Sequence, residues 1–177
     1  MPEHAPVPSP YKGLIFSGVI ENKSNDLPIS DVTTTDGNQF LTSEFGRYQL
    51  VISAPDSLTT FNFKSCNIAS FLSTGLPGLR PGISGTIIFF GTKPGGNQAT
   101  ETLAFIAQGA TEQSVEVGGF VLYGGTQMIY KQFTTLNGLN MLNISVMDTP
   151  ISIPLGIPVF ANGIALDNAT YEVIRAV

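Results

Sequence analysis

Length, composition and charge set the class of the chain. The 177 residues are 42% hydrophobic and only 12% charged, and they include 19 Gly and 12 Pro. This length suits a single domain, and Gly and Pro interrupt the sequence too often for long helices. The net charge is −5 and the eight basic residues are scattered, so nucleic acid is not an expected partner. No apolar run is long enough to span a bilayer as a helix, so no membrane span is expected.

The single cysteine and the first residues bear on the cellular compartment. Cys66 is alone, so no intramolecular disulfide can form, and a small buried hydrophobe is the expected role. Residues 1–6 show no cationic region followed by an apolar one, so no signal peptide is visible. Both a mature secreted protein and a cytosolic protein would have these features.

In chain order, an extended arm precedes one domain. Residues 1–10 contain four Pro and no periodic pattern, and they predict an extended N-terminal arm ahead of a domain of residues 11–177. Beyond the arm, short apolar runs and turn residues alternate about every ten residues, which is typical of a β-sandwich or barrel. Strands are expected at 14–20, 47–53, 58–65, 85–92, 100–106, 114–121, 139–147 and 164–174, with a turn at 94–97.

Side-chain alternation predicts which residues face the core. Phe61 and Phe63 share one face of their strand, because successive side chains of a strand point to opposite faces. Leu142, Ile144 and Val146 face inward in the same way. The run at 85–92 is apolar on both faces and predicts a strand that is buried on both sides. The sequence therefore predicts an all-β sandwich of mainly antiparallel strands.

The order of these segments resembles a known family. An opening Pro-Ser-Pro-Tyr-Lys-Gly-Leu-Ile-Phe-Ser stands at 8–17, and Phe-Asn-Phe-Lys-Ser stands at 61–65. A Gly-Thr-Ile-Ile-Phe-Phe-Gly-Thr-Lys strand and turn follows at 85–93, and Leu-Asp-Asn lies in the last strand at 166–168. This pattern resembles uncharacterised secreted fungal proteins with a galactose-binding-like jelly-roll fold. The resemblance implies a single extracellular jelly-roll β-sandwich.

Histidine and carboxylate counts limit the possible enzyme classes. His4 is the only histidine and lies in the predicted arm, which argues against a Ser-His-Asp or Cys-His arrangement and against a zinc site. A pair of carboxylates could still act in a glycosidase, and the candidates are Glu101, Glu112, Glu116 and Glu172. The alternative, which the sequence favours, is that these acids are solvated and point outward.

Two neighbouring residues near the end of the chain are candidate calcium ligands. Asp167 and Asn168 lie in the last predicted strand, where related jelly-roll carbohydrate-binding modules often hold a structural calcium ion. Calcium takes six to eight oxygen ligands, and no dense acidic loop accompanies this pair. The alternative is that Asp167 hydrogen-bonds to neighbouring backbone N–H groups and fixes a β-bulge. No other cofactor is expected.

Sugar binding calls for aromatic faces and planar amides, and this chain has no Trp. Tyr123 and Tyr130 bracket a Gly-rich segment and could expose two rings. Asn97 and Gln98 stand at a predicted hairpin tip, where their amides could donate hydrogen bonds to a sugar. The alternative is that all four are structural, since Tyr is a common half-buried strand residue.

Three glycosylation sequons give weak support for secretion. They begin at Asn22, Asn143 and Asn168. We therefore expect a secreted, non-catalytic binding module whose partner is a glycan on a cell wall or cell surface. Two alternatives remain open: a secreted effector or surface protein that binds another protein, and a carboxylate-dependent enzyme that acts on glycans.

Overall fold

The computed structural model describes residues 4–7, 10–23, 39–43, 49–73, 80–108, 114–117, 120–123, 125–147 and 161–176. All regular elements in these ranges are strands, which confirms the all-β prediction. They are β1 (His4–Pro6), β2 (Ile15–Ser17), β3 (Val19–Lys23), β4 (Gln39–Ser43), β5 (Gln49–Ser53), β6 (Thr59–Ser73), β7 (Gly85–Thr92), β8 (Gln98–Phe105), β9 (Ser114–Val117), β10 (Phe120–Tyr123), β11 (Ile129–Gln132), β12 (Met141–Val146) and β13 (Ala161–Arg175). In the part of the chain that is described, no helix is long and apolar enough to cross a membrane.

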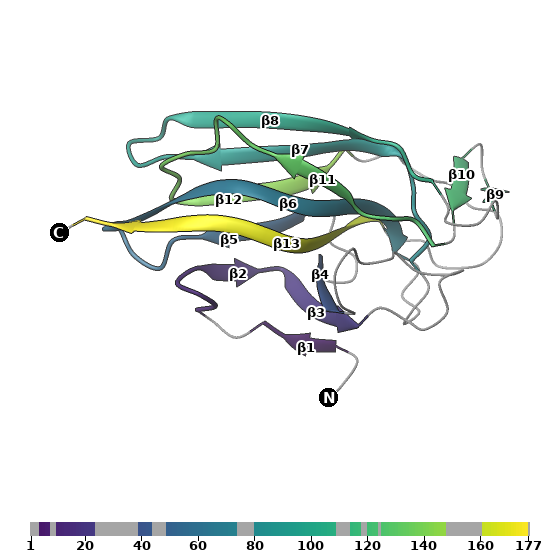
Figure 1. Ribbon diagram of the computed structural model, residues 1–177, viewed down its shortest axis with the longest axis horizontal. Coiled ribbons are helices and arrows are strands. Elements are labelled where there is room, and N and C mark those ends of the chain that lie inside the picture. The colour runs from purple at the N-terminus through teal and green to yellow at the C-terminus, as the bar shows by residue number, and fades with distance from the viewer. Residues whose placement is uncertain are drawn as a thin grey trace.

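The strands form an antiparallel β-sandwich. One sheet has the order β1-β3-β4-β13-β6-β11, and the other has the order β2-β5-β12-β7-β8. In Figure 1 the long strands β6 and β13 lie in front of β5 and β12, with β8 along one margin of the molecule. β9 and β10 pair with each other as a separate hairpin. The predicted β-sandwich is therefore confirmed.

Aromatic side chains from both sheets build the core. Phe63 of β6 and Phe89 of β7 come from opposite sheets, and both contact the ring of Phe133. The ring centroids lie 5.3 Å apart for Phe63 and Phe133, and 4.5 Å apart for Phe89 and Phe133. Phe133 follows β11 and so anchors the connection between the sheets. The five side chains predicted to face inward are all buried: Phe61, Phe63, Leu142, Ile144 and Val146.

The first predicted strand, 14–20, is in fact two strands in different sheets. Gly18 separates β2 from β3 with a φ of 71°, a conformation that glycine adopts readily because it has no Cβ. β2 pairs with β5 in the five-stranded sheet, and β3 pairs with β4 in the six-stranded sheet. The chain thus crosses from one layer to the other at Gly18.

The N-terminal residues also contribute to a sheet. His4–Pro6, which lie in the segment predicted as an extended arm, form β1 and pair antiparallel with β3. Pro6 lies opposite Ile20 at one end of this pairing. This part of the segment is therefore an edge strand of the six-stranded sheet, a position that tolerates proline.

Two further strand predictions need correction. The segment 114–121, predicted as one strand, forms the hairpin of β9 and β10, in which Phe120 lies opposite Val117. The sequence between these strands is Gly118-Gly119, a pair that favours tight hairpin connections. β7, predicted to be buried on both faces, buries Ile87 and Phe89, whereas Ile88 and Phe90 are half-buried. The reason is that an antiparallel sheet can pack on one face and leave the other in contact with water.

Candidate functional site

A β-bulge interrupts β13 at the residues singled out as calcium candidates. The register between β13 and β6 shifts between Asp167 and Thr170, and again between Thr170 and Tyr171. Asn168 has a φ of 46°, a left-handed conformation in which Asn is several-fold enriched. The Asn168 N–H donates a hydrogen bond of 2.7 Å to Oδ1 of Asp167. The Asp167 carboxylate therefore holds the backbone of the bulge.

A tight turn before β2 faces this bulge. Tyr11 and Leu14 exchange two backbone hydrogen bonds, of 2.8 and 3.1 Å. The residues between them, Lys12 and Gly13, have φ values of 45° and 85°, as in a type I′ turn. Gly accepts this conformation without cost, whereas a Lys backbone is strained in it.

The bulge and the turn enclose a cavity of about 340 Å³. Lys12 and Asn168 are the only non-glycine residues with positive φ in the described ranges, and both line this cavity. Strained backbone conformations tend to occur at binding sites, where the surrounding structure holds them in place. The cavity is therefore the candidate functional site.

Three aromatic rings form one wall of the cavity. Tyr11 and Phe16 meet edge to face with ring centroids 6.1 Å apart, and Phe16 and Tyr171 lie 6.4 Å apart. The Tyr171 hydroxyl reaches back to the Tyr11 carbonyl at 3.5 Å. Burial, together with the neighbouring Tyr11, raises the pKa of Tyr171, so this hydroxyl stays protonated at neutral pH. Tyr11 is 40% exposed, which leaves part of its ring open to solvent.

Polar groups stand next to this apolar wall. Lys12 places its ammonium group 5.3 Å from the centroid of the Tyr11 ring. Asp167 and Asn168 line the cavity from the bulge, and Asn168 is exposed. The site thus combines aromatic faces with an ammonium, a carboxylate and a planar amide.

Three of the residues predicted to bind sugar, Asn97, Gln98 and Tyr130, lie elsewhere. Asn97 is exposed in the turn between β7 and β8, and Gln98 is exposed at the start of β8, which confirms the predicted hairpin. Neither residue lines the cavity. Tyr130 is 64% exposed on β11 and also lies outside the cavity. Tyr123 belongs to β10, and its side chain is outside the described residues. Among the predicted site residues whose side chains are described, only Asp167 and Asn168 line the cavity.

Sequence reasoning missed the three rings of the wall: Tyr11, Phe16 and Tyr171. A partial signal for them exists: the opening segment at 8–17 contains Tyr11 and Phe16, whereas Tyr171 lies just after the Leu-Asp-Asn segment at 166–168. The two tyrosines lie 160 residues apart in the sequence, so no local pattern connects them.

The calcium prediction at Asp167 and Asn168 stays a prediction. No group of three or more His, Cys, Asp or Glu side chains that could hold a metal ion occurs among the described residues. A calcium ion at the bulge would therefore need backbone and amide oxygens for most of its six to eight ligands.

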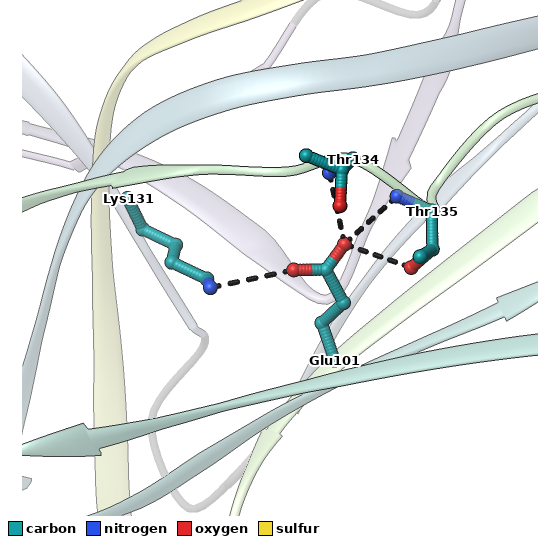
Figure 2. A network of polar contacts seen from close by, with 4 residues as sticks. All are labelled: Glu101, Lys131, Thr134 and Thr135. Carbon is teal, nitrogen blue, oxygen red and sulfur yellow. Dashed lines mark hydrogen bonds and ion pairs between the residues drawn. The ribbon is translucent and has the colours of Figure 1, made fainter.

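Glu101, a candidate catalytic acid, is held by the protein itself, as Figure 2 shows. Its side chain is 14% exposed on β8. One carboxylate oxygen accepts hydrogen bonds from the N–H groups of Thr134 and Thr135, both at 3.0 Å, and from the Thr135 hydroxyl at 2.8 Å. The other lies 3.3 Å from Nζ of Lys131. These contacts tie β8 to β11 and to the connection that follows β11.

The same contacts set the ionisation of Glu101. Burial alone would raise its pKa, but the hydrogen bonds from Thr135, Thr134 and Lys131 outweigh burial, and the net effect lowers the pKa. A carboxyl group with a lowered pKa stays ionised at neutral pH and is a poor general acid. The prediction of a solvated, outward-facing acid is therefore wrong for Glu101, which has a structural role.

Glu172, the other acidic candidate whose side chain the structure describes, has partners different from those of Glu101. Glu172 is exposed as predicted and contacts Nζ of Lys64 at 3.0 Å and the Asn62 amide at 3.2 Å. The hydrogen bond from Lys64 lowers the pKa of Glu172. The side chain of Glu116 and the whole of Glu112 lie outside the described residues.

The three sequons differ in their structural setting. Asn143 lies within β12 and donates its amide to Oε1 of Gln49 at 3.1 Å, so a glycan there would replace a contact in the middle of the sheet. Asn22 belongs to β3, and its side chain is outside the described residues. Asn168 is exposed on the bulge and lines the cavity.

No protein-family model matches the chain, and no curated protein matches its sequence. Among solved structures, the chain is similar to one described as "Structure of TmCBM61 in complex with beta-1,4-galactotriose". The TM-score is 0.40 with 8% sequence identity, over 94% of this chain and 90% of that chain. The two sheets of this chain define its fold, and the cavity between the turn and the bulge defines the candidate site.

Proposed function

We propose that the protein is a non-catalytic carbohydrate-binding module and that the cavity between the bulge and the N-terminal turn holds the sugar. One observation carries the proposal: both strained non-glycine residues, Lys12 and Asn168, line a cavity whose wall includes the rings of Tyr11, Phe16 and Tyr171. A sugar offers an apolar C–H face and a rim of hydroxyl groups. Rings at the wall and polar side chains beside them match these two surfaces.

The size and the charges of the cavity limit the ligand. Ligand pockets commonly range from about 300 to 1,000 Å³, so a cavity of about 340 Å³ is at the small end and suits about one or two sugar rings. Lys12 and Asp167 carry opposite charges, which favours a neutral ligand whose hydroxyl groups both donate and accept hydrogen bonds. The proposed ligand is therefore a neutral mono- or disaccharide unit of a larger glycan.

We also propose that the protein acts outside the cell. Support comes from the low charge content and the three sequons. A glycan on Asn168 would occupy the edge of the proposed sugar site. Protein from a host that does not add N-linked glycans is therefore the right material for binding measurements.

Calorimetric titration with a panel of neutral mono- and disaccharides tests the proposal. We expect saturable binding of at least one sugar, and Tyr171→Ala should weaken it about tenfold or more because a stacking face is lost. Tyr130→Ala is the matched control, since it removes an exposed tyrosine that lies outside the cavity. The proposal is wrong if no sugar in the panel binds, or if Tyr130→Ala weakens binding as much as Tyr171→Ala does.

A further inference from the structure

The strand β8 forms a long and regular edge of the five-stranded sheet. All eight of its residues pair with β7 without a bulge, from Thr92 opposite Gln98 to Gly85 opposite Phe105. Figure 1 shows β8 along a margin of the molecule, beyond β7. The opposite edge of this sheet, β2, has only three residues.

The hydrogen bonds of β7 show which groups of β8 point outward. The carbonyls of Thr86 and Thr92 accept hydrogen bonds from Met147 and Asn140 on the β12 side. In an antiparallel sheet, alternate residues of a central strand bond to opposite neighbours, so the odd-numbered residues of β7 bond to β8. The even-numbered residues of β8 then direct their backbone N–H and C=O groups away from β7, toward the open edge of the sheet. These residues are Gln98, Thr100, Thr102 and Ala104, and all four are exposed.

β8 lacks the usual protection of an edge strand. Natural edges carry proline, lysine, a bulge or an inward-pointing charge that prevents pairing with another chain. β8 has no proline, no lysine and no bulge. Its one charge, Glu101, points inward but is already neutralised by Lys131 and by the threonines shown in Figure 2. A strand added beside β8 would therefore not bury an unpaired charge.

We propose that β8 pairs antiparallel with β8 of a second copy of this chain, across a two-fold axis. The pairing would join two five-stranded sheets into one continuous sheet. Three features of the strand favour a second copy. An antiparallel strand edge is complementary to itself under two-fold rotation. The four even-numbered residues of β8 are uncharged, so two chains of net charge −5 can approach at this edge without direct repulsion between these side chains. Either Thr100 or Thr102 can also lie opposite its own copy across the axis, and cross-strand threonine pairs are favourable.

Sedimentation velocity of the full chain over a concentration series tests the proposal. The wild type should show a reversible monomer–dimer equilibrium, and Thr102→Pro should abolish the dimer. In the monomer the Thr102 N–H points to solvent, so its loss breaks no hydrogen bond within the sheet. In the proposed dimer this N–H donates to the second copy, and proline has no N–H to replace it. Thr102→Val is the matched control, because it keeps the backbone donor and should keep the dimer. A wild type that stays monomeric throughout the series would overturn the proposal, and so would a dimer that persists in Thr102→Pro.

Three further variants test the pairing in case the proline variant does not fold. Thr102→Lys keeps the N–H but brings like charges together across the axis, so it should also shift the equilibrium to monomer. Oxidation of Thr100→Cys and of Thr102→Cys should give a covalent dimer for at least one of the two. The native Cys66 is buried and does not compete in this reaction. Absence of a covalent dimer from both cysteine variants would contradict the pairing.

Discussion

Glu101 and Glu172 show how the partners of a side chain, and not its type, decide its role. Both are glutamates on long strands, and both pair with a lysine: Glu101 with Lys131 and Glu172 with Lys64. The Glu101 side chain is 14% exposed, whereas the Glu172 side chain is 54% exposed. Only Glu101 also binds two backbone N–H groups. We therefore expect only Glu101 to contribute measurably to stability.

Replacement of this carboxylate tests that expectation. Glu101→Gln should lower the free energy of unfolding by about 1–3 kcal/mol, because the charge-assisted contacts to Lys131, Thr134 and Thr135 are lost or weakened. Urea denaturation followed by far-ultraviolet circular dichroism measures this change. Glu172→Gln is the matched control and should leave the unfolding curve unchanged. Equal effects of the two substitutions would contradict the structural role of Glu101.

The same residue predicts a pH dependence with a definite sign. The pKa of Glu101 in the folded protein lies below its ordinary value of 4.5, so the unfolded chain binds the proton more tightly. The stabilisation by the ionised Glu101 carboxylate is complete at pH values above the ordinary pKa of 4.5. It is lost as the pH falls through the lower pKa of the folded protein. Between pH 7 and pH 3 the Glu101→Gln variant should lose less stability than the wild type. Parallel losses in both proteins would show that Glu101 does not titrate in this way.

At the scale of elements, β6 and β13 form the longest strand pair among the described residues and pack tightly near Gly163. Gly163 lies opposite Phe71, and a Cβ at Gly163 would clash with the Phe71 ring. Phe71 is only 2% exposed, so its ring has little room to move.

Gly163→Ala should therefore lower the free energy of unfolding by about 1–3 kcal/mol, as overpacking in a core does. The control is Gly85→Ala, whose Cβ would make only an ordinary contact of 3.5 Å with Val146. Thermal unfolding of both variants measures the difference. A melting temperature of Gly163→Ala equal to that of Gly85→Ala would contradict the close packing of β6 against β13.

The sequence predicted the strands better than it predicted their ends and neighbours. Alternation of side chains is a local property, so the inward positions of Phe61, Phe63 and Ile144 could be read directly. The break at Gly18 depends on the chain passing between two sheets, which no local pattern encodes. The half-exposed face of β7 likewise depends on which layers pack together.

At the scale of the whole molecule, the sandwich brings together segments near the two ends of the chain. The turn at Tyr11–Leu14 and the bulge that begins at Asp167 enclose the same cavity. The sequence singled out both segments through a family resemblance, and it predicted Asp167 and Asn168 as calcium ligands, which stays a prediction. It could not show that Tyr11 and Tyr171 meet, because their contact arises only when the two sheets pack.

The central claim is that this cavity binds a neutral sugar, and a titration followed by heteronuclear NMR tests it most directly. Added neutral mono- or disaccharide should produce saturable shifts in the backbone amides of Tyr11–Leu14 and of Asp167, Asn168 and Tyr171. The amides of Asn97, Gln98 and Tyr130 lie outside the cavity and should not shift. Saturable shifts confined to Asn97, Gln98 and Tyr130, or no shifts at the turn and the bulge for any sugar, would contradict the claim.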